Sequence, residues 1–98
     1  MRTIKTKPTE KETIVMKLRM YTIYDAKAET HCQPFFHYQD GQATRAFSDV
    51  VNNPETQIGK HPEDYTLFFC GTFDDETMDV VQVPPLSLGT GHNFANQN

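Results

Sequence analysis

The chain has 98 residues, a length that fits one domain. Hydrophobic residues make up 37% and charged residues 22%, which excludes a wholly disordered chain. No apolar run approaches the roughly 20 residues that a membrane-spanning helix needs. The net charge of −4 is uneven. Residues 1–19 hold six Lys and Arg against two Glu, net +4, and residues 20–98 hold three against eleven acidic residues, net −8. This predicts a basic arm on an acidic body, as in some polyanion binders, or simply a solubilising tail.

Residues 1–15 contain Pro8 and no sustained periodicity, so we expect a flexible basic extension before a domain spanning residues 16–90. The stretch 16–25 alternates as a strand does. One face carries Leu18, Met20, Thr22 and Tyr24. The other carries Lys17, Arg19, Tyr21 and Ile23. We expect the first set to face the core, because the second contains two cations.

Residues 26–33 are expected to form a connection, and residues 34–39 a short strand that begins at Pro34. Residues 40–54 give the clearest helix, with Asp40 as its N-cap and Pro54 ending it. Its apolar stripe at helical spacing consists of Ala43, Ala46, Phe47, Val50 and Val51. This stripe predicts one helix packed on one face of a sheet.

Residues 55–64 are expected to form a polar loop, and residues 65–74 a central strand with a bulge at Gly71. Tyr65, Leu67, Phe69 and Phe73 are assigned to one face of that strand. A polar hairpin turn at 74–79 leads to a return strand at 80–83, which Pro84 and Pro85 stop, and residues 91–98 are expected to fray.

These elements predict an α+β fold, a small, mostly antiparallel sheet of about four strands with one helix packed on one face. The helix-free face is expected to hold Tyr21, Ile23, Phe68 and Cys70. An apolar face left partly bare favours either a homo-oligomer or a ligand surface. The two cysteines, Cys32 and Cys70, are expected to be reduced and structural.

Several ordered blocks resemble the small nonstructural protein of microviruses, the gokushovirus branch of single-stranded DNA phages. The blocks are Tyr21 to Asp25, Gln33 to Phe36, Phe47 to Asp49, Gly59 to Leu67 and Gly71 to Asp75. The resemblance covers about residues 16–90, and the first 15 residues lie outside it. It implies a non-enzymatic DNA-binding protein with a part in genome synthesis or packaging. It also implies a place in the bacterial host cytoplasm and not in the virion shell.

Single-strand binders combine cations for the phosphates with aromatic rings for the bases. The candidate nucleic-acid-binding residues are Lys17, Arg19, Tyr21, Lys27, Phe36, Tyr38 and Phe68. The same rings could instead belong to the core or to a dimer interface. The alternative function is an assembly module that binds viral or host proteins through its exposed sheet face.

Metal and catalytic sites are not expected. His31, Cys32 and His37, with Cys70 or His61, match no zinc spacing. The acidic residues of 74–79 lack the spacing of a calcium loop.

Neither serine in the chain, Ser48 or Ser87, lies in a nucleophile elbow. His61 with Glu63 and Asp64 is a conceivable acid–base group, but ordering of the turn before the strand is the simpler interpretation. We therefore expect no cofactor and no enzymatic activity.

Overall fold

The computed structural model describes residues 17–95, so the expected extension at 1–15 lies outside the described part. The elements are β1 (Leu18–Asp25), β2 (Thr30–His31), β3 (Phe35–His37), α1 (Asp40–Val51), α2 (Gln57–Lys60), the 3₁₀ helix η2 (Pro62–Asp64), β4 (Tyr65–Phe73), β5 (Val80–Thr90) and α3 (Gly91–Phe94). They form one antiparallel sheet in the order β2-β1-β4-β5, with β3 also paired to β1. This confirms the predicted α+β class.

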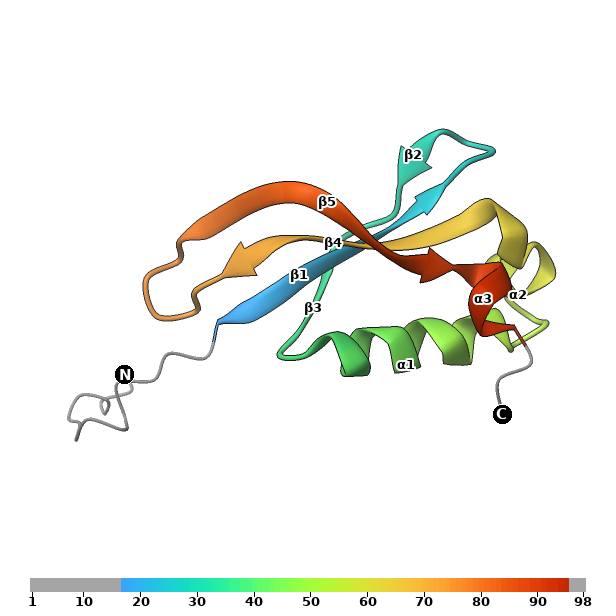
Figure 1. Ribbon diagram of the computed structural model, residues 1–98, viewed down its shortest axis with the longest axis horizontal. Helices are drawn as coiled ribbons and strands as arrows, with labels where there is room; N and C mark the ends of the chain where they lie inside the picture. Colours follow the sequence, from blue (N-terminus) through green and yellow to red (C-terminus); the bar gives the residue numbers. More distant parts are fainter. Residues whose placement is uncertain (1–16, 96–98) are drawn as a thin grey trace.

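Helix α1 lies against one face of the sheet, and α2, α3 and η2 gather near its C-terminal end (Figure 1). The buried core joins Ala43, Phe47 and Val51 of α1 to three side chains of the sheet, Tyr21, Ile23 and Leu67. Burial of each of the larger side chains contributes about 1.5–3 kcal/mol. The α1 stripe is therefore confirmed as the core-facing side of the helix.

The predicted core face of β1 is wrong. Tyr21 is 0% exposed and Ile23 9%, and both face the helix, so they do not lie on the bare side. Alternation gives two faces of a strand but does not say which face is covered. The cation Arg19 is tolerated on the covered side because it lies at the rim, where it pairs with Asp40.

A bulge in β4 explains a second error. Phe69 lies opposite Tyr21 and Gly71 lies opposite Met20, so β4 has one more residue than β1 at this point. The bulge expected at Gly71 is thus confirmed. Because one extra residue inverts the alternation beyond it, Phe73 pairs with Leu18 on the helix-free face and leaves the face of Leu67.

Strand β5 continues through the two prolines that were expected to stop it. Its pairing with β4 shifts between Phe69 and Gly71, where Leu86 and Gln82 are the successive partners. Pro84 and Pro85 fall in this interruption of the ladder, where the missing N–H groups cost least. As an edge strand, β5 arches over the sheet in Figure 1.

Two further segments differ from expectation. The loop predicted at 55–64 contains α2 and η2, and Thr56 caps α2 by accepting a hydrogen bond from the Gly59 N–H at 2.8 Å. Gly91–Phe94, the first part of the segment expected to fray, forms α3, and residues 96–98 lie outside the described part. The Phe94 ring packs on Phe47 with centroids 5.5 Å apart. Buried Gly91 lies so close to the Pro62 carbonyl that a side chain there would clash, so α3 is seated tightly on η2.

Candidate nucleic-acid interface

The face of the sheet opposite α1 carries aromatic rings in two groups, and the register defines its members. Phe68 lies opposite Thr22 and Phe36 lies opposite Met20, on the side away from the core. We call this surface the outer face; its side chains are Leu18, Met20, Thr22, Tyr24, His31, Phe36, Phe68 and Phe73. Among residues 17–95, all helices contact the other side of the sheet or its end.

The first ring group lies at the β2 end of the outer face. The His31 ring is 4.8 Å from that of Tyr24 and 6.0 Å from that of Phe68, measured between centroids. The second group pairs Phe36 with Phe73 at 5.8 Å. Phe36 is 40% exposed and His31 is also exposed. Tyr24, Phe68 and Phe73 are partly buried and keep only a smaller part of their surface open to solvent.

No Asp, Glu, Lys or Arg occupies a strand position of the outer face. From Leu18 to Tyr24 the strand spans about 20 Å, which is long enough for several stacked bases. Two exposed cations flank it along the chain, Lys17 before β1 and Lys27 in the turn after it. An uncharged aromatic sheet face between cations is the kind of surface on which single-stranded bases stack.

The structure divides the predicted DNA-binding residues between two sides of the sheet. Phe36 and Phe68 lie on the outer face, and Tyr38 is 44% exposed in the connection between β3 and α1. Tyr21 is fully buried on the opposite side, so a base cannot stack on it in this fold. Arg19 shares that side, and its guanidinium lies 3.9 Å above the Phe69 ring.

Arg19, Tyr21 and Asp40 instead form a latch between β1 and the first turn of α1. Asp40 Oδ1 accepts hydrogen bonds from Arg19 Nε at 2.8 Å and from the Tyr21 hydroxyl at 2.7 Å. Asp40 is therefore not the N-cap; Gln39 is, and Gln42 Oε1 accepts its N–H at 3.1 Å. The latch ties the N-terminal turn of α1 to β1.

The latch shifts the pKa values of Tyr21 and Asp40 in opposite directions. Burial raises the pKa of the Tyr21 phenol, and its hydrogen bond to Asp40 adds to this, so that it reaches about 12. Burial alone would raise the pKa of Asp40, but the hydrogen bonds from Tyr21 and Arg19 and the charge of Arg19 outweigh it and lower the value. The phenol stays neutral and the carboxylate stays charged at neutral pH.

Three aromatic rings of the outer face were not predicted from the sequence: Tyr24, His31 and Phe73. Tyr24 and Phe73 had been assigned to the core because the face of β1 was inverted and the bulge in β4 was not followed beyond Gly71. His31 was considered only as a metal ligand. If Tyr21 had been assigned to the core, the alternation of β1 would have placed Tyr24 on the opposite, outer face.

The remaining candidate clusters are smaller. His31 and His37 lie on opposite faces, His37 beside the Tyr21 ring at 6.1 Å, so they do not form the zinc group considered above. Burial raises the pKa of Cys32 and of Cys70, both free thiols, and the charge of Asp25 adds to the effect at Cys32. Raised values keep the thiols protonated and weaken them as nucleophiles.

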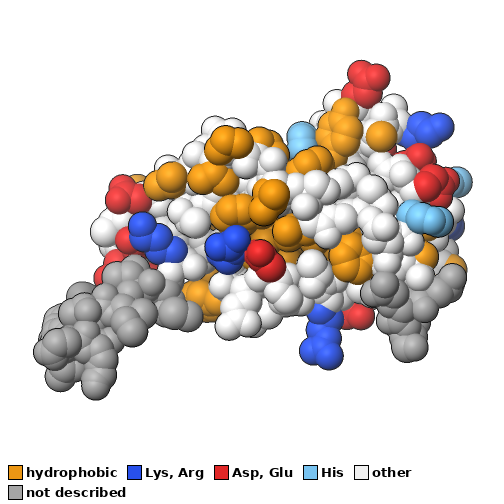
Figure 2. Space-filling view, viewed as in Figure 1, with side chains coloured by type: hydrophobic (Ala, Val, Ile, Leu, Met, Phe, Trp, Pro, Cys, Tyr) orange, Lys and Arg blue, Asp and Glu red, His pale blue; other side chains and the backbone are white. Residues whose placement is uncertain are grey.

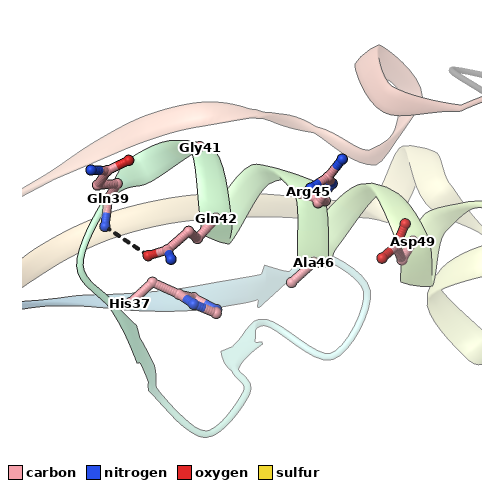
Figure 3. Close-up of a pocket in the computed structure, with 7 residues that line it drawn as sticks. All are labelled: His37, Gln39, Gly41, Gln42, Arg45, Ala46 and Asp49. Carbon is pink, nitrogen blue, oxygen red and sulfur yellow. Dashed lines mark hydrogen bonds between the residues drawn. The ribbon is translucent and has the colours of Figure 1, made fainter.

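Beside α1 there is an open hollow of about 420 Å³ (Figure 3). It is lined by His37, Gln39, Gly41, Gln42, Arg45, Ala46 and Asp49. In the close-up the ends of Arg45 and Gln39 point away from His37, so the polar groups do not converge on one point. This hollow therefore has no assembled chemistry.

Comparison with known proteins adds the family. The sequence model of the family described as Phage ORF5 protein matches residues 18–94, from the first strand to the last helix. The chain belongs to this phage protein family. No curated protein and no solved structure matches it. No helix within residues 17–95 has both the length and the apolar character that a membrane crossing requires.

The latch makes a prediction about pH. Because the folded-state pKa of Tyr21 is raised above the unfolded value of about 10, its contribution to stability is complete below about pH 10 and is lost as the pH rises toward about 12. Tyr21→Phe lowers the free energy of unfolding at pH 7 by about 1–2 kcal/mol. It also removes this part of the alkaline loss of stability.

Urea unfolding of both proteins at pH values from neutral to strongly alkaline measures the difference. Exposed Tyr38→Phe is the matched control and keeps the alkaline loss of the parent protein. An alkaline loss of the same size in Tyr21→Phe and in the parent would contradict the role assigned to the phenol.

Proposed function

We propose that the chain is a DNA-binding accessory protein of a single-stranded DNA phage of the microvirus type, acting in genome synthesis or packaging. It binds the strand stoichiometrically and without turnover, in the host cytoplasm and not as part of the virion shell. The observation that carries the proposal is the outer face, with its five rings on a surface that no described helix covers. Membership of a phage family and the resemblance to microvirus nonstructural proteins agree with it.

The distribution of charge supports stacking over phosphate neutralisation. Residues 20–98 carry a net charge of −8, so the body repels a polyanion at long range. Few lysines flank the rings. Each contact between a cation and a phosphate of a single strand lowers the logarithm of the binding constant by only about 0.7 per tenfold rise in salt concentration. Binding through the outer face is therefore only weakly salt-dependent. Any further affinity that salt removes comes from the cations of residues 1–15, which are Arg2, Lys5, Lys7 and Lys11.

The experiment replaces rings with aliphatic side chains of similar size. Phe36→Leu and Phe68→Leu keep an apolar surface but remove the π-face, and each weakens binding of a labelled oligothymidylate about fivefold, or about 1 kcal/mol, the lower end for one lost stack. Fluorescence anisotropy with the full chain measures the affinity. Phe36→Tyr is the matched control, because it keeps the ring and hence the affinity.

Two outcomes decide between the proposal and its rival. Equal losses in Phe36→Leu and Phe36→Tyr would show that the ring does not stack. Unchanged DNA affinity in all variants, together with altered self-association, would support the protein-interaction module instead.

Strand β5 favours that second candidate function, a module that binds its own copies or other viral or host proteins. Its eleven residues contain no charged side chain, and Val80, Val81 and Leu86 are 61%, 48% and 55% exposed. Hydrophobic side chains gather over this strand in Figure 2, with charged ones around them. An uncharged surface of this kind can meet a second copy of an acidic protein without repulsion.

Leu86→Asp tests the module. It brings a like charge into the contact and converts an oligomer to monomer in sedimentation velocity, while oligothymidylate affinity remains that of the parent. Thr44→Asp, on the solvent side of α1, is the control that leaves the sedimentation coefficient unchanged. A parent protein that is monomeric throughout the concentration series would contradict self-association through β5.

A further inference from the structure

A second cluster of chemically active side chains lies at the far end of the sheet from the β4–β5 turn. His61, Glu63 and Asp64 belong to η2 and the residue before it. The nitrogen of the imidazole and one oxygen of each carboxylate all lie within 4.8 Å of one another. His61 and Glu63 are exposed and Asp64 is half-buried, so the three groups share one solvent-accessible spot.

The backbone that presents these groups is held on two sides. The Asp64 carbonyl accepts the Ala26 N–H at 2.9 Å, which ties η2 to the turn after β1. On the other side Pro62 lies against Gly91 so closely that a side chain there would clash. Within the segment the Asp64 N–H donates to the His61 carbonyl at 3.0 Å. The side chains thus start from fixed positions, which lowers the entropic cost of bringing them onto one ion.

The three ligand atoms lie within reach of an ion with short bonds once one side chain moves slightly. Metal–ligand distances of about 2.0–2.2 Å place two ligands of one ion about 3–4 Å apart. Rotation of the exposed Glu63 side chain can close the remaining gap of about 1 Å without moving the backbone. Water completes the coordination, because three protein ligands leave positions open.

The ligand types select the ion. An imidazole nitrogen with two carboxylate oxygens suits zinc and its neighbours cobalt, nickel and manganese, whereas magnesium and calcium prefer oxygen alone. The acidic turn at 74–79 has more carboxylates but no imidazole. The imidazole is what distinguishes the η2 cluster from a solvated acidic surface.

We propose that His61, Glu63 and Asp64 form a binding site for a zinc-like divalent cation. The site is separate from the outer face, so the proposal of a cation site does not depend on DNA binding by the chain. Its open positions face solvent, so the bound ion can accept a further oxygen ligand such as a phosphate. A cation at this place also offsets part of the negative charge of the body.

The test is calorimetric titration of the metal-free full chain with Zn²⁺ at neutral pH, repeated with Co²⁺ so that the visible absorption reports the ligands. We expect one ion per chain, and a loss of affinity in His61→Ala of at least about tenfold, since even partners outside the coordination sphere contribute about 10–100-fold. Glu63→Gln and Asp64→Asn weaken binding in the same direction. An excess of Mg²⁺ does not displace the ion.

Two controls guard against other sites. Asp79→Asn, in the acidic turn, keeps the parent affinity. Cys32→Ser also keeps it and leaves the Co²⁺ spectrum without change, because no thiolate is a ligand. Circular dichroism shows that each variant is folded before titration.

The proposal is overturned by any of three results. The first is no heat of binding with Zn²⁺ up to about 1 mM, which is the weak end of protein affinities for cations. The second is full affinity for Zn²⁺ in His61→Ala. The third is loss of binding in Cys32→Ser alone.

Discussion

The docking of α1 on the sheet through Phe47, Tyr21 and Leu67 is the constraint on which the other features depend. These three are the largest fully buried side chains among residues 17–95. The polar hydroxyl of Tyr21 is buried only because Asp40 accepts its hydrogen bond, and the same carboxylate holds Arg19. One carboxylate in the first turn of the helix thereby satisfies both polar groups on the covered side of β1.

The covered side of β1 sets which side chains remain on the outer face. Because Tyr21 and Ile23 are covered, the alternate residues of β1 lie on the outer face. The bulge at Gly71 places Phe73 on the same face. A protein of this size has few apolar residues to spare, since its core is small. Of the five rings on the outer face, Phe36 and His31 remain exposed although their burial would have added stability. Exposed apolar surface of this kind supports the proposed binding role.

The sequence predicted the elements that local rules govern. The α1 stripe, the bulge at Gly71 and the turn before Val80 follow from periodicity, glycine and turn residues, and all three are confirmed. It did not predict the covered face of β1. The cation Arg19 argued against the side that is covered, and its ion pair with Asp40, which makes that side tolerable, is visible only in the structure. Nor did it predict β5 beyond Pro84, since tolerance of proline depends on the irregular pairing with β4. Of the five rings on the outer face, the sequence predicted two, Phe36 and Phe68.

The most direct measurement is an NMR titration of the full chain, with labelled aromatic side chains, against a short oligothymidylate. Ring currents of stacked bases shift the resonances of the protein rings that they cover. The account predicts upfield shifts for Phe36, Phe68 and Phe73, with Tyr21 and Phe47 unmoved. Binding without a shift in any labelled ring, or shifts confined to rings on the α1 side of the sheet, would contradict the claim that the outer face holds the strand.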